Sequence, residues 1–294
     1  MSYGVAGQDY RNLLYGLAHS NIPTLNSIES MIMNLERPLM YSALHGIQKR
    51  LGKERFPLIT QYYYPNWREM RITPNYPIVV KVGHVHAGYG KMMLTNQSNF
   101  EDLSSIMAIH NDYSTAEPYL DGEYDIRIQK IGNNYRAYKR TGMNGWKTNV
   151  GTSILEDIPM TEQYKLWIDE CSKLFGGMDI LAVDAIHNKL DNKDYILELN
   201  DTSIGLGPLH EDEDMLLIRD LTLNKMREAF SKRTLSQREK IDTTTLYKKL
   251  EVELINAQNS KIEIEKQLKE TKEKVTELTN ANQSMLFLYI IIFI

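Results

Sequence analysis

A glycine-rich stretch between two lysines is the first segment whose composition points to a chemistry. Lys81 follows the apolar residues 77–80, and three glycines lie between it and Lys91. Glycines let backbone N–H groups approach an anion closely, and lysine ammonium groups neutralise its charge. The stretch therefore indicates a phosphate-binding loop. It is not a P-loop, because Val85 stands where that motif needs its first glycine and no Ser or Thr follows Lys91, so an ordinary hairpin loop is the alternative.

Three oxygen-bearing side chains lie on two apolar segments later in the chain. Asp184 ends the run 181–184, and Glu198 and Asn200 lie in the run 195–200. If these runs are neighbouring strands, the three side chains converge, and hard divalent cations prefer carboxylate and amide oxygens. The alternative is that the acids are simply solvated. A carboxylate inside an apolar run is costly without a partner, so Glu198 favours a cation site.

A short acidic segment, residues 115–120, precedes the strand pattern that begins near Tyr124. A hinge formed by Glu117 and the backbone groups after it can contact adenine. Taken alone, the segment is a short turn, and we make no assignment from it.

Periodicity predicts a mixture of helices and strands around these residues. The predicted helices cover residues 39–51, 99–111 and 161–175, and the predicted strands cover 77–81, 124–130, 135–139, 179–186 and 194–199. Asn133 and Asn134 predict a hairpin turn, and Gly176 and Gly177 predict the end of the third helix. The strands occur in hairpins and do not alternate regularly with helices, which favours an α+β fold over a doubly wound sheet.

The composition changes near Ser231. Residues 231–284 lack proline and glycine and are rich in Lys, Glu, Gln and Thr, which predicts a helix. Its apolar seam is formed by Leu250, Leu254, Ala257, Ile264, Leu268, Val275 and Leu278. Lys261 and Thr271 interrupt this seam, so we predict an imperfect coiled coil. The apolar end, 285–294, is shorter than the roughly 20 residues of a bilayer span, so we expect it to bury against a partner helix, with membrane contact as the alternative.

Charge and cysteine content exclude several classes of protein. The formal charge is −4 and the hydrophobic fraction is 42%, which disfavours both duplex nucleic acid binding and a disordered acidic chain. The single cysteine, Cys171, excludes a disulfide framework. The first residues lack the charged and apolar regions of a signal peptide, so we expect a cytosolic protein.

The chain order of lysine strand, glycine loop, acidic hinge and paired acidic strands resembles the ATP-grasp fold, in which the nucleotide lies between two lobes. A closer resemblance, over residues 9–230, is to the central domain of synapsins. The segments that carry it are 21–30, 56–59, 83–91, 124–132, 145–149, 164–167 and 175–180.

The resemblance implies that the ligand is ATP with a divalent cation, Ca²⁺ or Mg²⁺. It assigns the phosphates to Lys81, Lys91 and Lys147, with Arg37 in the position of a family lysine. The loop that covers the phosphates contains Gly83, His84, Gly88 and Gly90, and His84 shapes it. Glu117 and Leu120 are expected to contact adenine, and Asp125 the ribose. The cation is expected to be held by Asp184, Glu198 and Asn200. The family has Asp-Lys-Pro where this chain has residues 36–38, and arginine presents a planar fork where lysine presents a compact charge.

The resemblance also divides the chain. We expect a remnant of the first lobe and a linking helix in 1–55, a small ATP-grasp lobe in 56–116, a carboxyl-terminal ATP-grasp lobe in 117–230, a helical coiled-coil-like tail in 231–284 and an apolar end in 285–294. The first lobe is expected to be shortened, which would weaken homo-oligomer formation.

In function, the resemblance implies an ATP-binding protein on the cytosolic face of presynaptic vesicles that contacts the vesicle surface and actin and regulates vesicle clustering and neurotransmitter release. The second interpretation is an ATP-grasp carboxylate-amine ligase. Such ligases usually carry an arginine two residues before the first metal carboxylate, where this chain has Ala182, so transfer chemistry lacks support. A third interpretation is a product that binds no nucleotide and acts through its tail. We expect the acids of 211–214 to open a helix as solvated first-turn residues.

Overall fold

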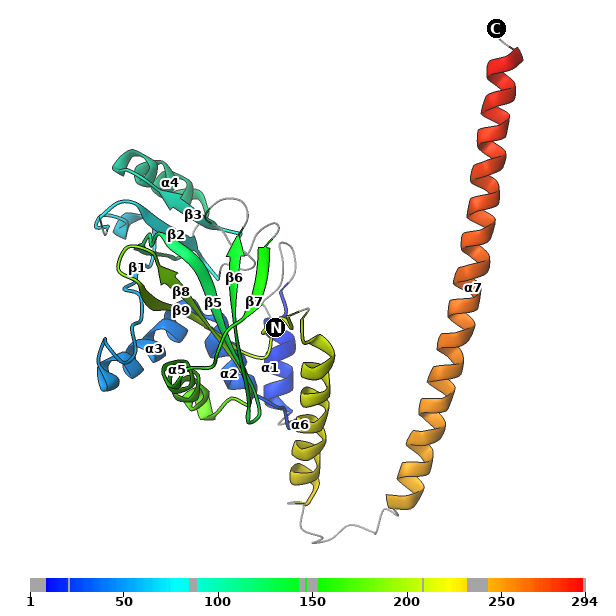
Figure 1. The fold of residues 1–294 in the computed structure, drawn as a ribbon, viewed down its shortest axis with the longest axis horizontal. Coiled ribbons are helices and arrows are strands. Elements are labelled where there is room, and N and C mark those ends of the chain that lie inside the picture. The colour runs from blue at the N-terminus through cyan, green and yellow to red at the C-terminus, as the bar shows by residue number, and fades with distance from the viewer. Residues whose placement is uncertain are drawn as a thin grey trace. The chain divides into compact units, whose positions relative to one another are not determined.

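The computed structural model describes residues 9–292 except 21, 74, 85–88, 111, 143–145, 147–152, 208 and 232–242. The chain divides into two compact units, residues 1–232 and residues 233–294, which are described separately. Figure 1 shows the elements of both units.

Three helices open the first unit: α1 (Arg11–His19), α2 (Ile28–Leu35) and α3 (Arg37–Leu51). The side chain of Ser27 caps α2 by accepting a hydrogen bond from the backbone N–H of Ser30 at 3.0 Å. Pro38 lies in the first turn of α3, where its missing N–H costs no hydrogen bond. The helix predicted for residues 39–51 is therefore confirmed and begins two residues earlier, at Arg37.

The small sheet contains β1 (Tyr62–Tyr64), β2 (Ile78–Val82), β3 (Lys91–Leu94) and β4 (Ser114–Pro118). Its order is β1-β4-β2-β3 with antiparallel neighbours. The helix α4 (Gln97–His110) and the 3₁₀ turn η1 (Trp67–Glu69) contact each other, and α4 contributes Phe100, Leu103 and Met107 to the apolar core of this sheet. Because β4 ends at Pro118, the strand crosses the boundary that the sequence suggested after residue 116.

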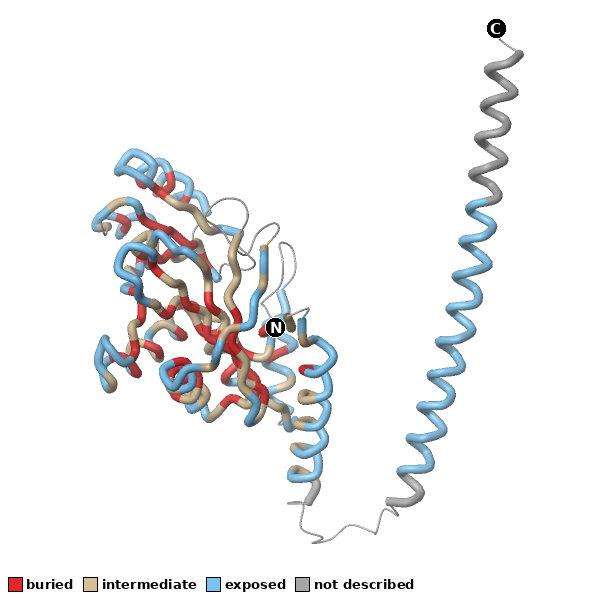
Figure 2. The backbone as a smooth tube through the Cα atoms, in the orientation of Figure 1, coloured by how far each residue is buried: buried red, intermediate tan, exposed pale blue. Residues whose placement is uncertain are grey.

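The large sheet contains β5 (Gly122–Ile131), β6 (Asn134–Gly142), β7 (Ser153–Asp157), β8 (Ile180–Asn188) and β9 (Lys193–Asn200). Its strands are antiparallel in the order β7-β6-β5-β8-β9, and the predicted hairpin between β5 and β6 is confirmed. Successive residues of β8 point to opposite faces: Leu181 and Val183 join one core cluster, and Ile180 and Ala182 join another. Both faces of β8 are therefore buried, and Figure 2 colours the buried residues of the chain red.

Helices cover both faces of the large sheet. α5 (Glu162–Ser172) and α3 contribute Trp167 and Leu44 to one core cluster, and α6 (Glu211–Ser231) packs Leu221 against the other. α5 ends three residues before the predicted position. The short 3₁₀ turn η2 (Leu174–Gly176) follows it, in which Phe175 has a left-handed φ of 53°. A left-handed residue cannot continue an α-helix.

The acidic residues 211–214 open α6 as expected, but the expectation that all of them are solvated is wrong for Asp214. Its side chain is 2% exposed and accepts a hydrogen bond from Gln129 Nε2 at 2.6 Å. Arg136 forms an ion pair with it at 3.1 Å. Asp214 therefore ties the first turn of α6 to the large sheet.

The second unit contains one long helix, α7 (Thr243–Ile292). It confirms the predicted helix from Thr243 onward and continues through most of the apolar end. Its described side chains, residues 247–276, are all exposed within this chain, including the seam residues Leu250, Leu254 and Leu268. The coiled coil stays a prediction. Across the described residues, no helix combines the length and the apolar character that a bilayer crossing requires.

Candidate functional site

Five charged side chains from five separate elements interact electrostatically in the first unit. They are Arg37 at the start of α3, Lys81 on β2, Lys91 on β3, Glu117 on β4 and Glu198 on β9. We call this set the charged cluster. Three cations against two carboxylates leave a net charge of +1. The sequence predicted all five as site residues, and the fold brings them together.

The small sheet positions the first ion pair of the charged cluster. β2 and β4 pair with Val79 opposite Glu117, so Lys81 is a diagonal neighbour of Glu117 on the same face. Lys81 Nζ lies 2.6 Å from Glu117 Oε1, and both side chains are 5% exposed. Burial lowers the pKa of Lys81, and Glu117 opposes this effect. Within the described residues, the buried Glu117 Oε2 has no hydrogen-bond partner, so one carboxylate oxygen stays available to a donor.

The second ion pair joins α3 to the large sheet. Arg37 Nη1 donates to Glu198 Oε2 at 3.1 Å, with the arginine side chain 8% exposed and the glutamate 30% exposed. Burial opposes the ionisation of Glu198, but Arg37, Lys81 and Lys91 outweigh it and hold the pKa at about 2. The buried Nε of Arg37 has no hydrogen-bond partner among the described residues. A buried N–H without an acceptor is unfavourable, so this donor is suited to an incoming anion.

The three predicted cation ligands come together as expected, although two of them are already bound to each other. β8 and β9 pair with Asp184 opposite Glu198, which confirms that the two strands are neighbours. Arg127 donates to both oxygens of Asp184, from Nε at 2.7 Å and from Nη2 at 2.8 Å. Asn200 Nδ2 also donates to Asp184, at 3.0 Å. Both oxygens of Asp184 are thus engaged, which leaves Glu198 as the carboxylate better suited to a cation.

The sequence analysis missed Arg127. It lies on β5 directly opposite Asp184, and it also donates from Nη1 to the backbone carbonyl of Ile204. Burial lowers the pKa of this arginine, and the charge of Asp184 more than compensates and raises it. No group of three or more His, Cys, Asp or Glu side chains arranged for a metal ion occurs in the described part of the chain.

Two glycines at the ends of the loop, Gly83 and Gly90, are described. Gly83 and Gly90 have φ angles of 59° and 66°, in the left-handed region that favours glycine. A Cβ at Gly83 would lie 2.4 Å from Oδ2 of Asp112, so a larger residue would displace that side chain. His84 Nδ1 lies 3.8 Å from Glu36 Oε2, consistent with a loop-shaping role. Gly88 and Lys147 lie outside the described residues.

The predicted hinge connects the two sheets. Leu120 lies between β4 and β5 and is half-buried, and the backbone N–H of Tyr119 donates to Pro77 O at 3.0 Å. Asp125, near the start of β5, lies 3.5 Å from Arg140 across the β5–β6 pair. The position of Asp125 as a ribose ligand stays a prediction.

Trp146 is a second residue that the sequence analysis did not single out. It follows β6 of the large sheet, yet its ring lies 5.1 Å from Lys91 Nζ, measured to the ring centroid. It also forms an edge-to-face contact with Tyr119, with ring centroids 6.3 Å apart. Trp146 therefore contacts both the charged cluster and the hinge. The family resemblance included the segment that contains Trp146, but nothing in the sequence indicated which side chains Trp146 would contact.

A buried polar network positions α2 against the end of β9. Asp201 follows Asn200 directly and accepts hydrogen bonds from Asn26 Nδ2 and Ser30 Oγ, each at 2.8 Å. Asn26 Oδ1 accepts from the backbone N–H groups of Asp179 and Ile180. Asn26 and Ser30 are fully buried. Because α3 begins directly after α2, this network helps to place Arg37 beside Glu198.

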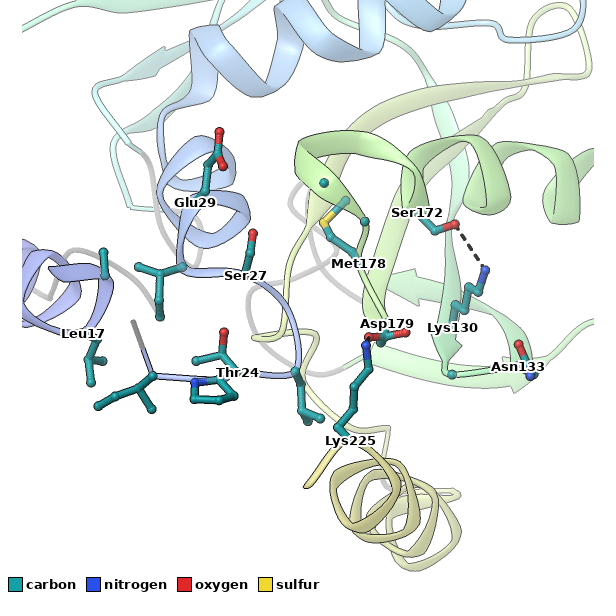
Figure 3. A pocket seen from close by; sticks show the side chains of 18 residues that line it. Leu17, Thr24, Ser27, Glu29, Lys130, Asn133, Ser172, Met178, Asp179 and Lys225 are labelled. Carbon is teal, nitrogen blue, oxygen red and sulfur yellow. Dashed lines mark hydrogen bonds and ion pairs between the residues drawn. The ribbon is translucent and has the colours of Figure 1, made fainter. Parts of the chain in front are cut away.

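A cavity of about 800 Å³ lies elsewhere in the first unit (Figure 3). It is lined by the α1–α2 connection, the β5–β6 turn, and Gly176 and Gly177 at the end of η2. Lys225 and Asp179 form an ion pair at 2.7 Å on its wall. None of the predicted site residues lines this cavity, so it is separate from the charged cluster.

The fold resembles solved ATP-grasp structures. D-alanine–D-alanine ligase from Bacillus anthracis matches with a TM-score of 0.55 at 15% identity, covering 74% of this chain and 77% of that one. The same ligase complexed with ATP matches with a TM-score of 0.53 at 14% identity, covering 74% of this chain and 76% of that one. ATP-grasp ligase PsnB, complexed with minimal precursor, matches with a TM-score of 0.51 at 15% identity, covering 70% of this chain and 67% of that one. The chain therefore has the predicted α+β, ATP-grasp-like fold, with a helical segment at its C-terminal end.

Sequence comparison identifies the family. The family model described as "Synapsin, ATP binding domain" matches residues 26–228. Synapsin from Drosophila melanogaster is 39% identical over 224 residues, which are 74% of this chain and 22% of that protein. The chain belongs to the synapsin family, as the resemblance predicted, and it spans about a fifth of the length of this relative.

Proposed function

We propose that the first unit binds ATP together with a divalent cation at the charged cluster. The observation that carries the proposal is the convergence of three cationic side chains, two of them buried, with two carboxylates at the junction of the sheets. The +1 charge of the cluster suits a polyanion, and its unpartnered buried atoms suit a ligand that both donates and accepts hydrogen bonds.

The proposal gives each element of the cluster a role. The phosphate oxygens are bound by Lys81, Lys91, Lys147 and Arg37, and they are covered by the loop of Gly83, His84, Gly88 and Gly90. Adenine contacts Glu117 and Leu120, and the ribose contacts Asp125. Lys81 and Glu117 act as a pair, because each is the nearest counter-charge of the other. Trp146 packs over Lys91 and limits how far that ammonium group can move.

The residues fit a hard divalent cation only in part. Glu198 and Asn200 offer a carboxylate and an amide, which are oxygen ligands of the kind that Ca²⁺ and Mg²⁺ prefer. Asp184 enters the proposal as the group that orients Asn200, because Arg127 engages both of its oxygens. When bound, the cation neutralises phosphate charge. Whether Ca²⁺ or Mg²⁺ is preferred is an outcome of the binding experiment.

Family membership supports a wider proposal for the cellular role. We infer that the chain acts as a synapsin-like protein on the cytosolic face of synaptic vesicles, where it regulates vesicle clustering and transmitter release. The vesicle surface, actin and a second copy of the chain are the partners that the family suggests. Removing residues 233–294 tests the tail: loss of vesicle binding with retained ATP binding would assign the interaction to α7.

Thermal unfolding with and without ATP and each cation tests the nucleotide proposal. Ligand at 100 times its Kd is expected to stabilise the fold by about 2.7 kcal/mol, because it binds only the folded state. K81M should reduce this effect. K225M is the matched control, because Lys225 pairs with Asp179 outside the cluster. The proposal fails if ATP stabilises neither the wild type nor K225M.

Product analysis separates binding from catalysis. Incubation with ATP alone is expected to give no sustained ADP release, since no arginine precedes Asp184 in the ligase position, which is Ala182. Sustained ADP release that depends on both a carboxylic acid and an amine would assign the carboxylate-amine ligase activity instead.

A further inference from the structure

The Arg37–Glu198 pair is incompletely satisfied. It joins residues 161 positions apart through one hydrogen bond, at 3.1 Å. Arg37 is 7% exposed, and its Nε has no hydrogen-bond partner in the described part of the chain. A guanidinium group presents five N–H donors in a planar fork, so one glutamate oxygen uses only a fraction of this capacity. The arginine is thus buried with donors that its present partner does not use.

The surroundings of the pair favour anions more strongly than cations. Lys81 and Lys91 both act on Glu198, in addition to Arg37. Lys81 has its own counter-charge in Glu117, at 2.6 Å. Glu198 is therefore the one carboxylate of the cluster that offsets Arg37 and Lys91. It supplies the negative charge that a phosphate group would supply, and Arg37 supplies the positive charge that a metal cation would supply beside Glu198.

We propose that Arg37 and Glu198 form an exchangeable ion pair that couples nucleotide binding to cation binding. This inference rests on the proposed function. Without nucleotide, Arg37 neutralises Glu198 and competes with a divalent cation for its oxygens. When phosphate is present, Arg37 turns from Glu198 to the phosphate oxygens, and Glu198 becomes available to the cation. Each charge exchanges one partner for another, so no charge is left buried and unpaired.

The exchange predicts a specific thermodynamic coupling. The full chain without nucleotide should bind cations weakly, because binding requires breaking the pair. Removing the arginine charge should raise the nucleotide-free affinity of Glu198 for a cation while lowering the affinity for ATP. Opposite effects on the two ligands distinguish an exchangeable pair from a residue that only binds phosphate, because the latter would affect ATP alone.

Calorimetric titration of the full chain with CaCl₂ or MgCl₂ alone, and separately with ATP, tests the exchange. The variants are R37Q, R37K and the double variant R37Q/E198Q. R50Q is the matched control, because Arg50 pairs with Glu170 outside the charged cluster. Circular dichroism checks the fold of each variant. R37K keeps the charge, so it provides a second measurement if R37Q does not fold.

R37Q is expected to bind the metal alone about tenfold more tightly than the wild type, within the usual range of coupling effects. The double variant should lose this gain, R37K should show a smaller gain, and R50Q should match the wild type. Unchanged metal affinity in folded R37Q, or in R37K if R37Q is unfolded, would overturn the exchange even if the wild type binds ATP. Absence of ATP binding by the wild type and by R50Q would instead contradict the proposed function.

Discussion

Two arginine–carboxylate pairs meet on neighbouring strands of the large sheet, where Asp184 lies opposite Glu198. Arg127 binds Asp184 through two hydrogen bonds and donates a further one to a backbone carbonyl. Arg37 binds Glu198 through one hydrogen bond and keeps a buried donor without a partner among the described residues. The first pair is satisfied by the protein, and the second is not.

The difference indicates that one pair contributes mainly to the stability of the fold and the other to ligand binding. A bidentate, buried pair has a fixed geometry, and losing either partner leaves an unpaired charge. A pair with one bond and a half-buried carboxylate can change partners at lower cost. We therefore assign Arg127 and Asp184 to the framework of the sheet, and Arg37 and Glu198 to the response to ligand.

The largest expected effect is on the framework pair. R127Q should lower the free energy of unfolding by about 3–5 kcal/mol, because it leaves the Asp184 carboxylate buried beside an uncharged residue. Urea unfolding measures this loss. Cys171 gives a second readout, because it is fully buried and burial raises the pKa of its thiol, so alkylation should require opening of the core. A loss below about 1 kcal/mol would remove the distinction between the pairs.

A somewhat smaller effect is expected at the buried pair of the small sheet. K81M should cost about 3 kcal/mol, because Glu117 would keep its charge without a counter-ion at 5% exposure. K81M/E117Q should recover much of this loss, since neither side chain then carries a charge. Chemical denaturation of K81M, E117Q and the double variant gives the comparison. If the double variant is as unstable as the sum of the single variants, the two residues do not act as a pair.

R37Q is expected to destabilise the protein less than either change above, by about 1–2 kcal/mol, because Glu198 is partly exposed and keeps Lys81 and Lys91 nearby. Its effect on ATP affinity should be about tenfold, or about 1.4 kcal/mol. Urea unfolding without ligand and calorimetry with ATP provide the two values. A stability loss as large as that of R127Q would place Arg37 in the framework as well.

The smallest expected effect is that of removing residues 233–294. The chain divides into two compact units at this point, so the free energy of unfolding of the first unit should change by less than about 0.5 kcal/mol. Denaturation of the shortened chain, followed by tryptophan fluorescence to which the buried Trp167 contributes, measures it. A larger change would mean that residues 233–294 contribute to the stability of the first unit.

The residue pattern predicted the elements of the site better than the contacts within it. The apolar run before Lys81 and the apolar run around Glu198 specify strands, because burial of both faces leaves a continuous apolar signal. The Arg127–Asp184 pair was not predictable, since it joins residues 57 positions apart and depends on strand register. The pairing of Lys81 with Glu117 was missed for the same reason, and each residue was assigned a separate ligand contact.

The burial of individual polar residues could not be predicted from the residue pattern either. Asp214 reads as one of four first-turn acids, and only the packing of α6 on the large sheet shows that it is enclosed by Gln129 and Arg136. Trp146 lies in a segment without periodicity, and its contact with Lys91 joins residues that are distant in the sequence.

The buried network of Asn26, Ser30 and Asp201 has a kinetic consequence for ligand exchange. It ties α2 to the chain three residues beyond Glu198, and the backbone that carries Arg37 continues directly from α2. With both backbones anchored, exchange of partners at the ion pair requires only rotation of the side chains of Arg37 and Glu198. Relaxation after a rapid jump in nucleotide concentration should then show no phase that reports a shift of α2 against β9.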